Sequence, residues 1–156
     1  MDEPTRRTIR HIFLTPRPSF ALLNAADWLG ITLKELKKEI EDGVIVAGST
    51  AMGVRIIKDE MMAAAMRVWE LGVIEEALGD DAPSVLPEAI RLVELRARVP
   101  RYQREMLREL ARREGTSVDH VLTRELEDVA SAYSEELAGV PGFAMAMQWP
   151  AGCEAE

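Results

Sequence analysis

The sequence predicts a mainly α-helical protein with short β elements, organised as two modules. Apolar residues recur at helical spacing over most of the 156 residues, and Gly and Pro mark the stops between the helical stretches. Two short stretches, residues 44–57 and 93–99, show strand patterns instead. Apolar side chains make up 47% of the chain and aromatic ones only 5%. The chain is therefore expected to fold around aliphatic and Met side chains.

The N-terminal half begins with a charged, Pro-containing segment, residues 1–17, which we interpret as a tail. Residues 18–79 form the first predicted module. A helix over 19–29 should end at Gly30, and a second should begin at Thr32, where Thr32-Leu33-Lys34-Glu35 fits a capping box. The turn between these two helices predicts a helix-turn-helix shape.

A β-hairpin is expected next, over residues 44–57. The strands should be 44–46 and 54–57, because both stretches are rich in β-branched residues. The Gly-containing stretch 48–53 should form the turn. Asp59 can then cap a third helix that runs to about Leu78, with Met and Trp in its apolar stripe. Such a stripe is typical of a core or a dimer seam.

The C-terminal half opens with a predicted linker, residues 80–92, followed by a module over 93–137 and a tail over 138–156. The module begins with a strand that ends at Pro100, a residue suited to the first turn of a helix. Gly115 should stop that helix, and a second helix should run to Tyr133. Successive strand residues point to opposite faces. The polar face consists of Glu94, Arg96 and Arg98, and the apolar face of Val93, Leu95, Ala97 and Val99.

This strand, Pro, helix, Gly, Ser, helix order resembles the ribbon-helix-helix domain of Arc-, MetJ- and CopG-type repressors. The resemblance implies that two chains pair their strands into one antiparallel ribbon, whose polar face enters the DNA major groove. It also implies a phosphate contact at the start of the second helix, at Thr116, Ser117 and Val118. The expected dimer core consists of Val93, Leu95, Ala97, Val99, Leu122 and Leu126. The alternative is a solvated edge strand of an ordinary α+β domain.

The helix-turn-helix and hairpin of the first module are similar to the winged helix-turn-helix of MerR-type regulators and phage excisionases. That resemblance implies further DNA-contact candidates, which are Thr32, Lys34, Lys37, Lys38 and Arg55. The second helix mixes its three Lys with four acidic residues over 35–42. A module that only packs or binds a protein partner is therefore an equal alternative.

The net charge of −8 weighs against nucleic-acid binding until it is divided by segment. Residues 1–58 carry a net +2 and residues 93–115 a net +3, whereas residues 59–92 carry −6 and residues 116–156 carry −7. Because contact with phosphate needs a local positive surface rather than a positive total, DNA binding stays compatible with this sequence.

The sequence offers no sign of catalysis, so we expect no enzyme, no metal and no cofactor. Its only cysteine is Cys153, and its two histidines, His11 and His120, are far apart. No apolar run reaches the roughly 18 residues of a membrane span, so a cytoplasmic protein is expected.

These patterns favour a dimeric, sequence-specific DNA-binding protein. It would be a transcriptional repressor that binds double-stranded DNA as a homodimer or as a higher oligomer of such dimers. The alternative is an antitoxin or adaptor whose main partner is a protein, such as a toxin or an effector. Residues 137–153 are uncharged and partly apolar, and this tail resembles that of antitoxins, in which a partner-binding C-terminal tail often follows a ribbon-helix-helix domain.

Overall fold

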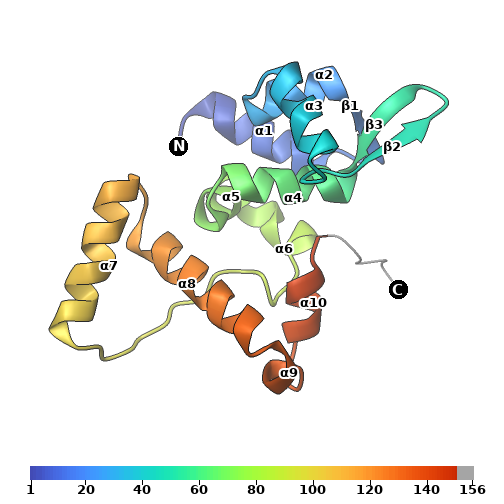
Figure 1. Cartoon of the computed structure of the whole chain (residues 1–156). Coiled ribbons are helices and arrows are strands. Elements are labelled where there is room, and N and C mark those ends of the chain that lie inside the picture. The colour runs from blue at the N-terminus through green and yellow to red at the C-terminus, as the bar shows by residue number, and fades with distance from the viewer. Residues whose placement is uncertain (151–156) are drawn as a thin grey trace. The chain divides into compact units, whose positions relative to one another are not determined.

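The computed structural model describes residues 1–150 and is mainly helical, with one three-stranded antiparallel sheet (Figure 1). This confirms the predicted class of a mainly α protein with short β elements. The described chain divides into two compact units: residues 1–87 together with residues 147–150, and Glu88–Ala146. Residues 151–156, which include Cys153 and the end of the predicted C-terminal tail, lie outside the described residues.

The first unit places its three-stranded sheet among helices that bury one continuous apolar core. Its elements are α1 (Glu3–Leu14), β1 (Ser19–Ala21), α2 (Leu22–Leu29), α3 (Leu33–Glu41), β2 (Ala47–Thr50), β3 (Gly53–Ile57), α4 (Lys58–Val68), α5 (Leu71–Leu78), a 3-10 turn (Gly79–Asp81) and α6 (Ala82–Val85). β3 is the central strand, and Phe20 of β1 and Ala47 of β2 both pair with Ile56. The sheet thus joins the segment before α2 to the hairpin that follows α3.

The predicted N-terminal tail is wrong, because residues 3–14 form α1 and belong to the core. Asp2 caps the helix by accepting a hydrogen bond from the Thr5 N–H at 2.8 Å. Ile9, Ile12 and Phe13 share one face and are fully buried. The charged first turn indicated a solvated segment, but it occupies only the outer face of an amphipathic helix.

The α2–α3 pair agrees with the prediction at its joint and differs at its start. Gly30 ends α2 with a positive φ of 70°, and the Thr32–Glu35 capping box is present in both directions, at 2.7 and 3.2 Å. The predicted start at Ser19 is wrong, since residues 19–21 form β1 and bury Phe20 against the sheet. A three-residue strand is too short to show alternation in the sequence.

The hairpin exists, but its first strand lies later than predicted. Residues 44 and 45 close the end of α3, where both N–H groups donate to the Glu39 carbonyl at 2.8 and 3.2 Å. The strand is therefore β2, Ala47–Thr50, and the turn shortens to Ala51 and Met52 before Gly53, whose φ is +96°. Residues 48–50, which the sequence predicted as part of the turn, have small side chains, and main-chain pairing with β3 is enough to hold them in a strand.

Two further predictions fail between residues 58 and 92. The single helix over 59–78 is two helices, because Trp69 adopts an extended conformation between α4 and α5. The predicted linker at 80–92 is also wrong over its first part. Pro83 lies in the first turn of α6, a position that suits Pro, and Ala82 and Leu86 are buried in the core.

The second unit contains the predicted helix pair, α7 (Arg101–Glu114) and α8 (Val118–Ala132), followed by α9 (Ser134–Leu137) (Figure 1). Gly115 ends α7 with a φ of 68°, and the Ser117 hydroxyl caps α8 by accepting from the His120 N–H at 3.0 Å. The predicted strand over 93–99 is absent from the single chain, because residues 92–100 form neither helix nor strand and pair with no strand of the described chain. Of residues 88–146, only Ala111 and Val121 are buried.

The predicted tail over 138–156 contains α10 (Phe143–Gln148). Gly142 precedes it with a φ of 78°, and a Cβ at that position would lie 2.8 Å from the Ala89 Cβ. This close approach holds the start of α10 against the first residues of the second unit. Trp149 packs against the core of the first unit, so the chain leaves that unit at Pro87 and rejoins it at Met147.

Candidate nucleic-acid interface

The extended segment 92–100 presents its apolar side chains to solvent. Val93 is 85% exposed, Leu95 67% and Val99 48%, and Ala97 is exposed as well. The remaining predicted dimer-core residues follow the same pattern, since Leu126 is exposed and Leu122 is half-buried. A row of exposed aliphatic side chains along an unpaired segment is the surface that a second chain would have to cover.

The polar side chains of this segment differ in their partners. Arg96 donates two hydrogen bonds to the Glu94 carboxylate, at 3.0 and 3.2 Å, so these two residues lie on the same side of the segment. Arg98 makes no side-chain hydrogen bond or ion pair with any residue of 1–150. In the free chain the guanidinium of Arg98 is therefore available to bind a ligand. The guanidinium of Arg96 can do so only after it breaks its hydrogen bonds to Glu94.

Most arginines of α7 are engaged by glutamates of the same helix. Glu109 accepts from Arg112 and Arg113, and these hydrogen bonds lower the pKa of Glu109 to about 2. Glu105 likewise accepts from the arginines on either side of it, and its pKa is lowered chiefly by its hydrogen bond with Arg104. These pairs are exposed and screened by water, so their net effect is to neutralise the helix surface.

Arg101 is a candidate that the sequence prediction missed. It is the first residue of α7, directly after Pro100, and it has no side-chain partner among residues 1–150. The signal was present in the composition, because residues 93–115 hold seven Arg and only four Glu. Once each Glu is taken by a neighbouring Arg, some guanidiniums must remain unpaired, and here they are those of Arg98 and Arg101.

The predicted phosphate contact at the start of α8 is only partly available. The Thr116 N–H donates to the Ala111 carbonyl at 3.0 Å as part of the C-terminal cap of α7, so in the free chain it is occupied. The Ser117 hydroxyl is used as the cap of α8. Val118 is the first residue of α8, so its N–H lacks an acceptor inside the helix. Asp119 adds a negatively charged side chain to the same first turn of α8.

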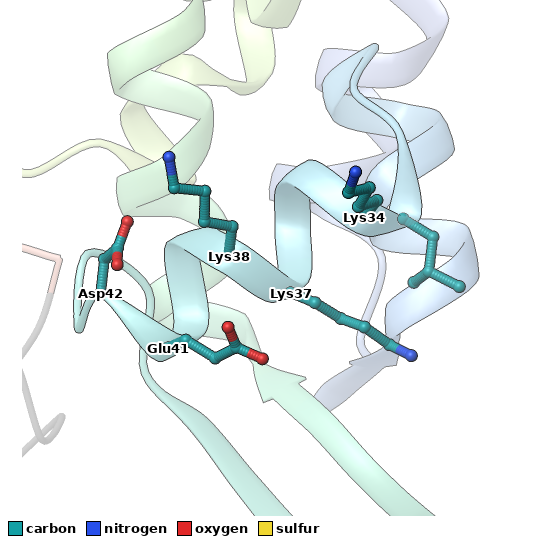
Figure 2. Close-up of a pocket in the computed structure, with 6 residues that line it drawn as sticks. Lys34, Lys37, Lys38, Glu41 and Asp42 are labelled. Carbon is teal, nitrogen blue, oxygen red and sulfur yellow. The ribbon is translucent and has the colours of Figure 1, made fainter.

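In the first unit, the predicted lysines lie along the exposed side of α3. Lys34, Lys37 and Lys38 border a shallow hollow together with Leu33, and Glu41 and Asp42 border its far end (Figure 2). All six residues come from one helix and the turn after it, so a partner surface must complete any site here. Thr32 is engaged in the capping box, whose hydrogen bonds lower the pKa of Glu35.

Arg55, the predicted contact on the hairpin, is turned towards the neighbouring strand. Its Nε donates to the Ser19 Oγ at 2.8 Å, and its second guanidinium nitrogen donates to the Ser19 carbonyl at 3.1 Å. It is the only charged residue between positions 43 and 57. The hairpin instead exposes apolar side chains, those of Val46, Met52, Val54 and Ile57.

Among residues 1–150, no cluster of three metal-ligating side chains is found, and no helix is both long and apolar enough to cross a bilayer. Comparison with protein-family models, with curated proteins and with solved structures gave no match for this chain.

Proposed function

We propose that the chain is a homodimeric, sequence-specific DNA-binding protein, a transcriptional repressor with a ribbon-helix-helix reader at residues 93–137. The observation that carries the proposal is the unfinished core of the second unit. Its 59 residues bury only Ala111 and Val121, while Val93, Leu95 and Leu126 stay largely exposed. A pair of helices with one unpaired segment buries too little apolar surface to be stable alone.

A second copy of the same segment completes this core in the simplest way. Antiparallel pairing of residues 93–99 across a two-fold axis satisfies the unpaired backbone groups. It also turns Val93, Leu95 and Val99 inward, because alternate residues share a face. The opposite face then carries Glu94, Arg96 and Arg98 from each chain.

That polar face suits a major groove. Arg96 and Arg98 lie about 7 Å apart on one side of an extended segment, and the dimer doubles them. A guanidinium can donate two hydrogen bonds to the O6 and N7 atoms of guanine, and a good contact of this kind contributes about 1–3 kcal/mol of base discrimination. In the free chain two nitrogens of Arg96 donate to Glu94, so Arg96 must exchange that carboxylate for the guanine, whereas Arg98 has no such pair to break.

In this proposal the first unit is a winged helix-turn-helix module. The order α1, β1, α2, α3, β2, β3, with β3 central in the sheet, is compatible with that architecture. Its α3 would lie on DNA with Lys34, Lys37 and Lys38, which are exposed.

A second function, an antitoxin or adaptor that binds a protein, is favoured by the hairpin. Its four exposed apolar side chains and its engaged Arg55 make a poor phosphate-binding surface and a good protein-binding one. In that case DNA binding would be confined to the second unit, or would be weak.

The salt dependence of DNA affinity tests both functions. Each phosphate neutralised contributes about −0.9 to the slope of log affinity against log salt. Arg101 of two chains supplies two unpaired guanidiniums for phosphate, for a slope of about −2, and the six α3 lysines of a dimer steepen it to about −7. Gel shifts on a selected operator should give a slope of about −7, falling to about −2 in the triple variant Lys34→Gln, Lys37→Gln, Lys38→Gln.

The wild-type slope decides between the functions. An unchanged shallow slope of about −2 in both proteins assigns α3 to a protein partner. If Arg98→Ala leaves specific binding intact, or if no operator can be selected at all, the ribbon is not a DNA reader and the adaptor function replaces the repressor.

A further inference from the structure

The first unit contains a cavity of about 340 Å³ that the proposed DNA surface does not use. It lies beside the joint between α3 and the hairpin, and α2, α3 and α4 all contribute to it. Its lining residues are Leu29, Ile31, Glu39, Val44, Ala64, Arg67 and Val68.

The cavity has an apolar floor and an open rim. Leu29 and Ala64 are buried beneath it, and Val44 and Val68 stand half-exposed at its edge. Its volume is at the lower end of the roughly 300–1,000 Å³ of small-molecule sites, which excludes a dinucleotide and suits a compact ligand. An aliphatic group of a bound ligand would exclude water from the exposed apolar side chains of Val44 and Val68.

Two opposite charges border the same cavity without being paired to each other. Neither the Glu39 carboxylate nor the Arg67 guanidinium makes a side-chain hydrogen bond or an ion pair within the part of the chain that the structure describes. Their helices are well anchored, since α4 contributes the buried Ala64 and Ala65, and the Glu39 carbonyl accepts from both Val44 and Ile45. A ligand that carries both signs of charge can satisfy the two side chains together.

We propose that this cavity binds a free α-amino acid with an aliphatic side chain. The ligand carboxylate accepts two parallel hydrogen bonds from the guanidinium of Arg67. The ligand ammonium lies on Glu39, and the side chain packs on Leu29, Ile31 and Ala64. A ligand with one charge would leave either Glu39 or Arg67 without its partner, which is how the site discriminates.

The test uses the full chain and three probes of nearly equal apolar size: L-leucine, 4-methylpentanoate, which lacks the ammonium, and 3-methylbutylamine, which lacks the carboxylate. We expect millimolar L-leucine to raise the thermal unfolding midpoint and to saturate in calorimetric titration, because a ligand that binds only the folded state stabilises it. Each analogue should bind at least about tenfold more weakly, since it loses one charged contact.

Two variants separate the contacts. Arg67→Gln should remove the preference for L-leucine over 3-methylbutylamine, and Glu39→Gln the preference over 4-methylpentanoate. Both side chains lack partners within residues 1–150, so both variants should fold, which circular dichroism checks. Arg7→Gln, on the exposed side of α1, is the matched control and should bind L-leucine as the wild type does.

Two results would overturn the proposal. One is that L-leucine, L-isoleucine and L-valine all fail to shift unfolding or to produce a titration signal at millimolar concentration. The other is binding that the double variant Arg67→Gln, Glu39→Gln leaves unchanged. DNA takes no part in these measurements, so their outcome is independent of the function proposed above.

Discussion

Leu95→Ala is the most direct test of the dimer, because its effect can be worked out from the exposure of one side chain. Leu95 is 67% exposed in the isolated chain. Full burial of a Leu side chain contributes about 1.5–3 kcal/mol, so burying the exposed two thirds contributes about 1–2 kcal/mol. The two-fold axis counts this contribution twice, which gives about 2–4 kcal/mol in each dimer. We therefore expect the dimer dissociation constant to rise roughly 30- to 700-fold.

The assay is sedimentation equilibrium over a dilution series, with circular dichroism to check helix content. Leu23→Ala is the matched control, because Leu23 on α2 is 68% exposed and belongs to the first unit. It should leave the dissociation constant unchanged. The reasoning is refuted if Leu95→Ala dimerises as tightly as the wild type, or if the wild-type chain is a folded monomer at every micromolar concentration tested.

Two further predictions concern the first unit. Arg10 joins α1 to the end of α5 and the turn after it, because its guanidinium donates to the Leu78 carbonyl at 2.8 Å and to the Asp81 carboxylate. Arg10→Met should therefore lower the free energy of unfolding in urea by about 1–2 kcal/mol. Arg7→Met, which removes an exposed ion pair, should change it by less than about 0.5 kcal/mol. Burial, with a smaller contribution from the charge of Arg17, lowers the pKa of His11 below 6.5, so the fold favours the neutral ring. The contribution of His11 to the free energy of unfolding should be fully present above about pH 6.5 and should decrease as the pH falls towards the lowered pKa. His11→Gln should remove this pH dependence from urea midpoints measured between about pH 7 and pH 5.

Local signals gave four helix ends correctly, but the predicted cap at Asp59 is wrong, because α4 begins at Lys58 with Ile57 as its N-cap and has no side-chain cap. Gly30 and Gly115 end helices because they adopt a positive φ, and Thr32 and Ser117 begin helices through hydrogen bonds to residues three positions later. Each of these features depends on neighbouring residues only, so a reader of the sequence can find it.

The missed elements depend on partners far along the chain. Phe20 lies in a strand because it pairs with Ile56. The turn after α5 is held because Arg10 donates to the Leu78 carbonyl at the end of α5 and to the Asp81 carboxylate within the turn. Polar, Gly-containing sequence around Asp81 is typical of a linker when no such partner is known. The same limit applies to Arg55, whose engagement by Ser19 spans 36 positions.

The same distinction between local and long-range determinants applies to the candidate site. Period-two alternation was enough to place Glu94 and Arg96 on one side of the segment, and their hydrogen bonds agree with that placement. Which arginines stay unpaired could not be predicted from spacing, because Glu105 and Glu109 each have several arginines within reach and side-chain geometry decides among them.

The two chain connections between the units affect how α3, whose exposed side carries both lysines and acidic residues, could contact DNA. The chain enters the second unit at Glu88 and rejoins the first at Met147, so each copy of α3 is tethered at both ends of the reader. In the proposed dimer, DNA held by the ribbon meets the α3 lysines as an intramolecular event, with an effective concentration that is commonly millimolar for short connections. A contact that the acidic neighbours Glu41 and Asp42 weaken can still add affinity under that condition. The mixed charge of α3 therefore counts against DNA binding by an isolated first unit, and much less against DNA binding by the intact dimer.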